Sequence, residues 1–151
     1  MIKIIAVGYL KEDYLKEAVT EYLKRIKRYN QIEIIEIKDE SKYEKDKILK
    51  KEATEIIKKI NQKDYIITLE IEGKQFTSIE FAKNIDKVFN ETNNITFIIG
   101  GSYGLAEEIK EMSNLHMSLS KMTLPHQLFR VVLLEQIYRA FKIINNENYH
   151  K

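Results

Sequence analysis

Cysteine and tryptophan are absent from this 151-residue sequence, which has one proline and five glycines. Without cysteine the chain can form neither a disulfide framework nor a thiolate metal site, and we expect no metal centre. No apolar run approaches the roughly 20 residues of a membrane-spanning helix, and the apolar start, residues 1–8, is too short for the core of a signal peptide. The missing features predict a cytoplasmic protein with no membrane segment.

Hydrophobic residues make up 44% of the sequence and charged residues 32%, a balance typical of a folded globular protein. The length matches one domain by the usual range of roughly 100 to 200 residues. No internal repeat or linker is visible, so we expect residues 1–151 to form a single domain.

The positive charge is unevenly distributed along the chain. Residues 112–151 hold five basic and two acidic residues, a net +3, so with a chain total of +2 the first 111 residues carry −1. All three histidines also lie in the C-terminal part. The imbalance is either a chance excess or the mark of a region that contacts an anionic partner.

Apolar runs of strand length alternate with segments of helical periodicity, which is typical of strands joined by helical crossovers. The pattern predicts an α/β fold with a mostly parallel sheet flanked by helices. Strands are expected at Ile2–Gly8, Gln31–Ile37, Tyr65–Ile71, Ile95–Ile99 and Leu115–Ser118. Helices are expected over Tyr14–Tyr29, Lys42–Asn61, Thr77 or Ser78 to Phe89, Ala106–Met112 and Gln127–Ile144.

Three local features refine this layout. The turn Glu72–Lys74 is expected to close the third strand. Pro125 suits the first turn of the last helix, where its missing N–H is not needed. The helix over residues 42–61 has only a narrow apolar stripe, so its lysines are expected to lie on a solvated face and to serve solubility.

Ligands of open α/β sheets bind at the carboxyl ends of the strands. Three segments are expected to meet there: Leu69–Gly73, Gly100–Gly104 and Leu119–Leu124. The glycine pair after the fourth strand is either a structural tight turn or a loop that lets a ligand approach the backbone. Because the segments offer apolar walls, backbone groups and hydroxyls but little fixed charge apart from Lys121, the crevice suits an adenosine better than a triphosphate.

The last helix is apolar on most of its circumference, which predicts burial on two sides. We expect one side to face the sheet and the other a second subunit, with burial under the chain's own loops as the alternative. Glu135 and Arg139 are four positions apart and can pair. Arg130 has no acidic residue three or four positions away and is expected to be free to contact a phosphate.

The histidines and the C-terminal tail have several possible roles. His116, in a short strand, is expected to be structural. His126, at the start of a helix, can cap it, orient a neighbour or transfer a proton. The tail would normally fray, yet its last three residues are types that stack on a base, move a proton and bind a phosphate: Tyr149, His150 and Lys151.

Five stretches closely resemble one family. They are Ile-Ile-Ala-Val-Gly at 4–8, Leu-Glu-Ile-Glu-Gly-Lys at 69–74, Ile-Ile-Gly-Gly-Ser-Tyr-Gly-Leu at 98–105, the long run from Leu119 to Ala140, and the ending Tyr-His-Lys. In this order they resemble the RlmH family of SPOUT-class methyltransferases, which methylate N3 of a pseudouridine in bacterial large-subunit (23S) ribosomal RNA. The resemblance covers the whole chain, although residues 38–63 match mainly in helical character.

The resemblance implies a C-terminal trefoil knot, S-adenosylmethionine (SAM) held in the knot, and a homodimer whose active site draws on both subunits. On matching positions it assigns cofactor binding to Leu69, Gly100, Leu119, Ser120, Lys121, Met122, Thr123 and Leu124. These residues belong to the three strand-end segments selected above on physical grounds.

Methylation at N3 requires in-line positioning of the reactants and loss of the N3 proton. We expect His150 or His126 to handle this proton. Arg130 and Arg139 are expected to contact a phosphate or another anion, and Tyr149 to stack on the base. The modest net charge favours ribosomal RNA within an assembled ribosome as the target. Two alternatives remain: a SPOUT enzyme that methylates transfer RNA, and a catalytically silent module that binds an adenosine ligand and RNA.

Overall fold

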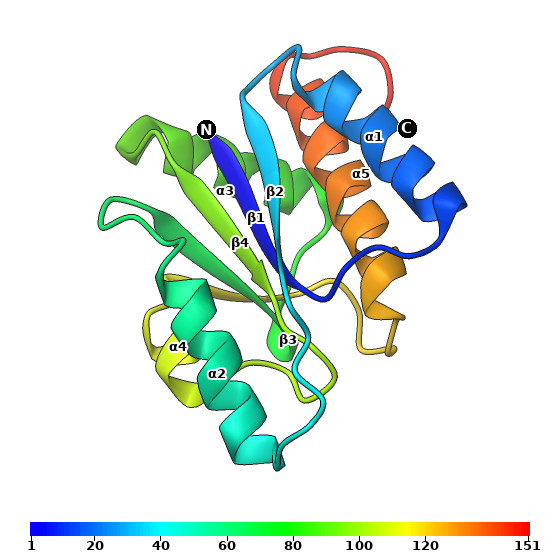
Figure 1. Ribbon diagram of the computed structural model, residues 1–151. Helices are drawn as coiled ribbons and strands as arrows, with labels where there is room; N and C mark the ends of the chain where they lie inside the picture. The colour runs from blue at the N-terminus through cyan, green and yellow to red at the C-terminus, as the bar shows by residue number, and fades with distance from the viewer.

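Five parallel strands form one sheet in the order β2-β1-β4-β3-β5 in the computed structural model, which describes residues 1–151 (Figure 1). The strands are β1 (Ile2–Val7), β2 (Ile32–Ile37), β3 (Tyr65–Gln75), β4 (Ile95–Ile99) and β5 (Leu115–Ser118). The helices are α1 (Asp13–Ile26), α2 (Lys45–Ile57), α3 (Ser78–Glu91), α4 (Glu107–Glu111) and α5 (His126–Ile144). The predicted α/β class and parallel sheet are confirmed.

Helices cover both faces of the sheet (Figure 1). On one face, α1, α3 and α5 share a core with Ile4 and Ala6 of β1. On the other face, α2 and α4 pack against Ile5 and Val7. Successive side chains of a strand point to opposite faces, so β1 is buried on both sides. Its one charged residue, Lys3, is also buried and pairs with Asp64 (3.5 Å).

Helix α3 begins with a capping box, which agrees with one of the two predicted caps. The Thr77 hydroxyl accepts a hydrogen bond from the Glu80 N–H (3.1 Å), and the Glu80 carboxylate accepts one from the Thr77 N–H (2.8 Å). Ser78, the other candidate, donates to the Gln136 side chain of α5 instead (2.8 Å). This bond joins the start of α3 to its neighbouring helix.

The prediction of a turn at Glu72–Lys74 is wrong. β3 continues to Gln75 with an irregularity in its pairing with β5. Gly73 lies so close to β5 that a Cβ at this position would sit 2.5 Å from the carbonyl carbon of Met117. The glycine therefore permits a close contact between two strands and does not reverse the chain.

Helix α5 lies between α1 and α3 on the sheet. Its inner side is fully buried, whereas Val131 and Tyr138 are half-buried and Leu128 is 39% exposed. The chain's own helices thus cover part of its second apolar side, and the expected second subunit stays a prediction, as does the knot.

Helix α5 begins at His126, with Pro125 as its N-cap residue and not within its first turn. None of the helices combines the length and apolar character needed to cross a membrane.

Candidate functional site

A cavity of about 950 Å³ opens at the carboxyl edge of the sheet, a size typical of ligand sites. Its walls come from the middle of β3, from the end of β4 with its following turn, and from the loop after β5, so the convergence predicted for the three segments is confirmed. The lining consists of residues 69–72, 99–105, 118–120 and 122–126, together with Lys45, Lys110 and Phe129.

Seven of the eight residues assigned to the cofactor line this cavity: Leu69, Gly100, Leu119, Ser120, Met122, Thr123 and Leu124. The eighth, Lys121, is exposed and does not line it. The expectation that Lys121 supplies the fixed charge of the crevice is therefore wrong. That charge comes from Lys45 and Lys110, opposed by Glu70 and Glu72.

The glycine turn after β4 forms one wall of the cavity. The Gly104 N–H donates a hydrogen bond to the Gly101 carbonyl (3.0 Å), which closes a tight turn. A Cβ at Gly100 would overlap the Gly104 carbonyl oxygen, so no other residue fits there without a shift of the backbone. The two roles considered for the glycine pair are thus compatible, because the same turn is tight and borders the cavity.

Hydroxyl groups shape the loop after β5. The Ser118 hydroxyl donates to the Ser120 carbonyl (3.0 Å), and the Ser120 hydroxyl accepts from the Met122 N–H (2.9 Å). The Thr123 side chain lines the cavity, is exposed and forms no hydrogen bond within the chain. Two hydroxyls therefore hold the loop, and the third is available to a ligand.

Helix α5 starts at the cavity, where His126 belongs to the lining. One turn later, Arg130 is fully buried and pairs with Glu36 of β2 (2.7 Å). Its guanidinium also donates to the carbonyls of Gly8 (2.6 Å) and Val7 (3.3 Å). The expectation that Arg130 is free to contact a phosphate is wrong, because Arg130 is buried and already paired. Its acidic partner lies on a distant strand and not within the same helix. Arg130 instead joins α5 to the ends of β1 and β2.

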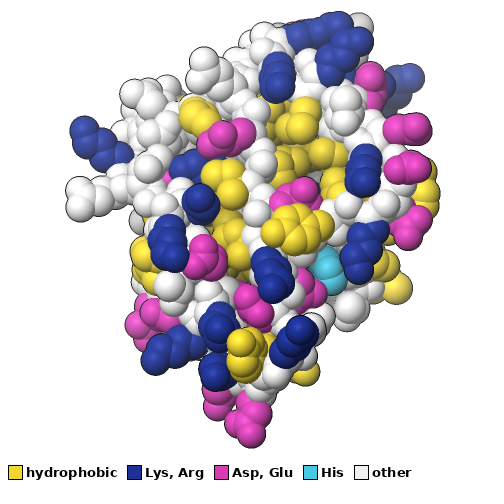
Figure 2. Space-filling model, viewed as in Figure 1, with side chains coloured by type: hydrophobic (Ala, Val, Ile, Leu, Met, Phe, Trp, Pro, Cys, Tyr) yellow, Lys and Arg dark blue, Asp and Glu magenta, His cyan; other side chains and the backbone are white.

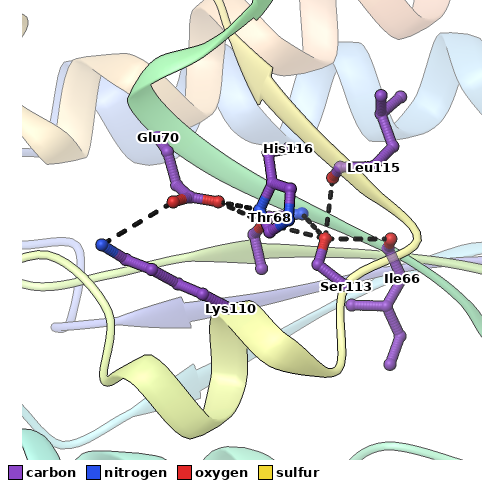
Figure 3. A network of polar contacts seen from close by, with 7 residues as sticks. All are labelled: Ile66, Thr68, Glu70, Lys110, Ser113, Leu115 and His116. Carbon is purple, nitrogen blue, oxygen red and sulfur yellow. Dashed lines mark hydrogen bonds and ion pairs between the residues drawn. The ribbon is translucent and has the colours of Figure 1, made fainter.

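A polar network stands beside the cavity in the middle of β3 (Figure 3). The Glu70 carboxylate contacts Nδ1 of His116, accepts a hydrogen bond from the Thr68 hydroxyl (2.6 Å) and lies 3.7 Å from Lys110. The Thr68 hydroxyl oxygen also lies 2.9 Å from that of Ser113. Burial raises the pKa of Glu70, but the hydrogen bonds from Thr68 and His116 and the charge of Lys110 outweigh it and hold the pKa below its ordinary value. These contacts agree with the structural role expected for His116.

Sequence reasoning missed the charged residues of the lining. Glu70 lies inside a segment that was selected for its apolar and backbone groups. Lys45 and Lys110 reach the cavity from α2 and α4, which lie on the face of the sheet opposite α5. No local pattern distinguishes these two lysines from the many others in the sequence.

The remaining predicted catalytic residues form a second cluster near the end of α5. Arg139 pairs with Glu135 as predicted (2.6 Å), and its Nη1 lies 3.2 Å from Nδ1 of His150. Tyr149 donates to Glu135 (3.1 Å), and its ring centroid lies 4.7 Å from the Arg139 guanidinium. Burial and the bond to Glu135 raise the pKa of Tyr149 to about 12. The tail is docked on α5 and is not frayed.

The two groups of predicted catalytic residues lie far apart in one subunit. Thirteen helical positions separate His126 from Arg139, which corresponds to about 20 Å at a rise of about 1.5 Å per residue. His126 lines the cavity and Arg130 is buried one turn behind it, whereas Arg139, Tyr149 and His150 lie together near the C-terminus of α5.

A buried carboxyl group supports the glycine turn from the side of α2. Glu52 is 4% exposed and accepts a hydrogen bond from the Glu40 N–H (3.3 Å). A Cβ at Gly101 would lie 3.4 Å from the Glu52 carboxyl and 3.5 Å from that of Asp39. Burial, reinforced by the neighbouring carboxyls of Asp39 and Glu40, raises the pKa of Glu52 to about 7. The group is therefore protonated at mildly acidic pH.

Comparison with known proteins shows the family of this chain. Residues 1–150 match the family described as "Predicted SPOUT methyltransferase". The chain belongs to the SPOUT methyltransferase family. Proteins of Ruminiclostridium cellulolyticum and Clostridium perfringens named ribosomal RNA large subunit methyltransferase H are 50% and 48% identical to it, and a Methanococcus vannielii relative is 55% identical. Each comparison covers 99% of both chains. The RlmH resemblance is confirmed.

The fold of this SPOUT methyltransferase also resembles a solved structure. A methylase family protein from Haemophilus influenzae superposes with a TM-score of 0.58 over 99% of this chain and 70% of that chain, at 16% sequence identity. At this identity the likeness concerns the fold alone.

Replacing Arg130 tests whether it anchors α5 in this SPOUT methyltransferase. We expect Arg130→Ala to lower the free energy of unfolding by about 3 kcal/mol, because two carbonyl groups and Glu36 lose their buried donor. Urea denaturation followed by circular dichroism measures the change. Arg28→Ala is the control, since Arg28 is exposed and has no ion pair, and it should change stability by less than about 0.5 kcal/mol. Equal, small effects of both substitutions would contradict the anchoring role.

Replacing Glu52 by Gln tests its raised pKa. The unfolded chain ionises Glu52 near its ordinary pKa of 4.5, whereas the folded protein resists ionisation until about pH 7. Its contribution to stability is thus complete below the unfolded value and is lost as the pH rises through about 7. We expect the melting temperature of Glu52→Gln to increase relative to wild type between about pH 5 and about pH 8. The exposed Asp86→Asn serves as control, and a pH-independent difference for Glu52→Gln would refute the raised pKa.

Proposed function

We propose that this chain is a SAM-dependent methyltransferase that methylates N3 of a pseudouridine in 23S ribosomal RNA within assembled ribosomes. The observation that carries the proposal is the cavity, whose walls are the segments that the resemblance assigns to SAM. Full-length identity of 48–50% to proteins named ribosomal RNA large subunit methyltransferase H supports the substrate. A ribosomal substrate implies a cytoplasmic location.

The residues around the cavity fit SAM. Leu69, Ile99 and Leu124 offer apolar walls for an adenine ring, and the glycine turn offers backbone groups. The Thr123 hydroxyl and the Glu70 carboxylate can hydrogen-bond a ribose. The carboxylates of Glu70 and Glu72 offset the charges of Lys45 and Lys110, which disfavours a nucleoside triphosphate. When bound, SAM supplies an electrophilic methyl group on a sulfonium.

Residues of one subunit provide part of the remaining chemistry. The proton on N3 must leave, and the His126 imidazole at the cavity wall is a candidate acceptor. Arg130 acts as a positioning residue, because it fixes the first turns of α5 and so the place of His126.

A second subunit would complete the site. Arg139, Tyr149 and His150 lie about 20 Å along α5 from His126, so they reach a cavity only in another copy of the chain. In a two-fold homodimer the tail of each subunit can approach the cavity of the other. There Tyr149 would stack on the target base, Arg139 would contact an anion, and His150 would be a second candidate for the proton.

Complementation between two inactive variants tests the shared site. Leu124→Trp obstructs the cavity, and His150→Ala removes the tail imidazole. We expect each homodimer to lose methyl transfer to ribosomes, whereas co-expression returns about a quarter of the wild-type activity, because half of the dimers are mixed and each holds one intact site. Radiolabelled methyl incorporation measures the activity, and a single chain with both substitutions is the control. A mixture without activity would oppose a shared site, and full activity of His150→Ala would remove this residue from the mechanism.

Identification of the methylated nucleoside tests the proposed substrate. The protein is incubated with SAM and either ribosomes, isolated subunits, protein-free ribosomal RNA or transfer RNA, and the digested nucleosides are analysed by mass spectrometry. We expect N3-methylpseudouridine in ribosomal RNA, formed far more slowly on protein-free RNA because the ribosome supplies contacts that a chain of net charge +2 does not make. A methylated nucleoside in transfer RNA would favour a SPOUT enzyme that acts on transfer RNA. Stabilisation of the protein by SAM without any methylated product would favour a catalytically silent module that binds an adenosine ligand and RNA.

A further inference from the structure

Lysines and tyrosines gather at the start of α2, next to the cavity. We call Tyr43, Lys45, Lys47, Lys51 and Tyr103 the α2 patch. Both tyrosines are exposed, at 40% for Tyr43 and 53% for Tyr103. Over α2, Figure 2 shows Lys and Arg side chains beside hydrophobic and acidic ones at the lower end of the molecule. The α2 patch therefore combines exposed aromatic rings with cations.

The lysines of the α2 patch lie over aromatic rings and form no ion pairs. The Nζ atoms of Lys47 and Lys51 each lie 4.4 Å from the ring centroid of Tyr43, and that of Lys45 lies 6.0 Å from the ring of Tyr103. Every ion pair of the chain involves other residues. Because no carboxylate occupies these ammonium groups, their hydrogen-bond donors remain available to a phosphate.

The charge of this stretch is locally strong. Residues 42–51 contain five lysines against Glu44 and Asp46, a net +3, which exceeds the +2 of the whole chain. The two carboxylates weaken long-range attraction but leave the lysines unpaired. The stretch therefore suits short-range contacts with a polyanion that other parts of the protein have already positioned.

The α2 patch is continuous with the cavity. Lys45 and Tyr103 belong to the cavity lining, and Tyr103 stands in the glycine turn between Gly100 and Gly104. Tyr43, Lys47 and Lys51 extend the same surface outward along α2. A nucleic-acid strand with one base at the cavity would thus pass its neighbouring phosphates and bases over the patch.

We propose that the α2 patch binds the RNA strand next to the target nucleotide. Lys45, Lys47 and Lys51 contact phosphates, and Tyr43 and Tyr103 stack on unpaired bases, the combination by which proteins hold single-stranded RNA. The inference rests on the proposed function, since it names the surface that carries the substrate of the same site. It also replaces the view of these lysines as serving only solubility.

Removal of two lysines outside the cavity tests the proposal. The variant is Lys47→Gln/Lys51→Gln, and the matched control is Lys83→Gln/Lys87→Gln on α3, where both lysines are exposed. Co-sedimentation with large ribosomal subunits from cells lacking this enzyme measures affinity across a range of salt concentrations. We expect the patch variant to bind on the order of tenfold more weakly near physiological salt. The slope of log K against the logarithm of the salt concentration should decrease in magnitude by about 1 for each lysine removed. SAM affinity, measured by calorimetry, should not change.

Equal affinity of the patch variant and the control variant would overturn the proposal. Tyr43 gives a second test, because Tyr43→Phe keeps a ring for stacking and should bind like wild type, whereas Tyr43→Leu should bind several-fold more weakly. Equal binding by these two variants would refute the stacking role.

Two further readouts separate this inference from the proposed function. If the wild type transfers no methyl group but its binding to large subunits depends on the patch, the proposed function fails and the inference stands. If the wild type methylates and the patch variants bind and methylate normally, the inference fails alone. A photo-reactive residue at position 43 should cross-link to ribosomal RNA, and cross-linking only to ribosomal protein would overturn the assignment of RNA as partner.

Discussion

All five strands run in the same direction, and the arrangement of the cavity depends on this constraint. Ile99 of β4 pairs with Ala6 of β1 and with Leu69 of β3. The residues that follow these positions therefore emerge at one edge of the sheet, where the glycine turn, the Glu70 network and the buried Arg130 are found. Crossover helices return the chain after each strand, which leaves this edge to loops that can surround a ligand.

Much of the fold and the place of the cavity could be predicted, because both depend on local patterns. Buried parallel strands are apolar runs, helices show their own periodicity, and the rule that parallel strands end at one edge turns three separate segments into one site. The identity of the ligand could not be predicted from these local patterns. The residues pointed to an adenosine, whereas SAM and the target nucleoside followed only from the family resemblance.

Other features depend on contacts that no local pattern reveals. The partner of Arg130 lies 94 positions away, on another strand, so spacing within a helix could not identify it. Gly73 has a neighbour only because β5 returns beside β3. Lys45 reaches the cavity from a helix whose lysines are typical of any solvated face. The role proposed for Arg139 and His150 requires a second subunit, which the pattern of one chain does not describe.

Hydrogen exchange with and without SAM tests most directly whether the cavity at the carboxyl edge is the cofactor site. On the proposed account, SAM slows amide exchange in residues 100–105 and 118–124, which form the cavity walls, and leaves α1 unchanged, because α1 contributes no residue to the lining. Protection confined to other segments, or no binding of SAM by the full-length protein, would contradict it.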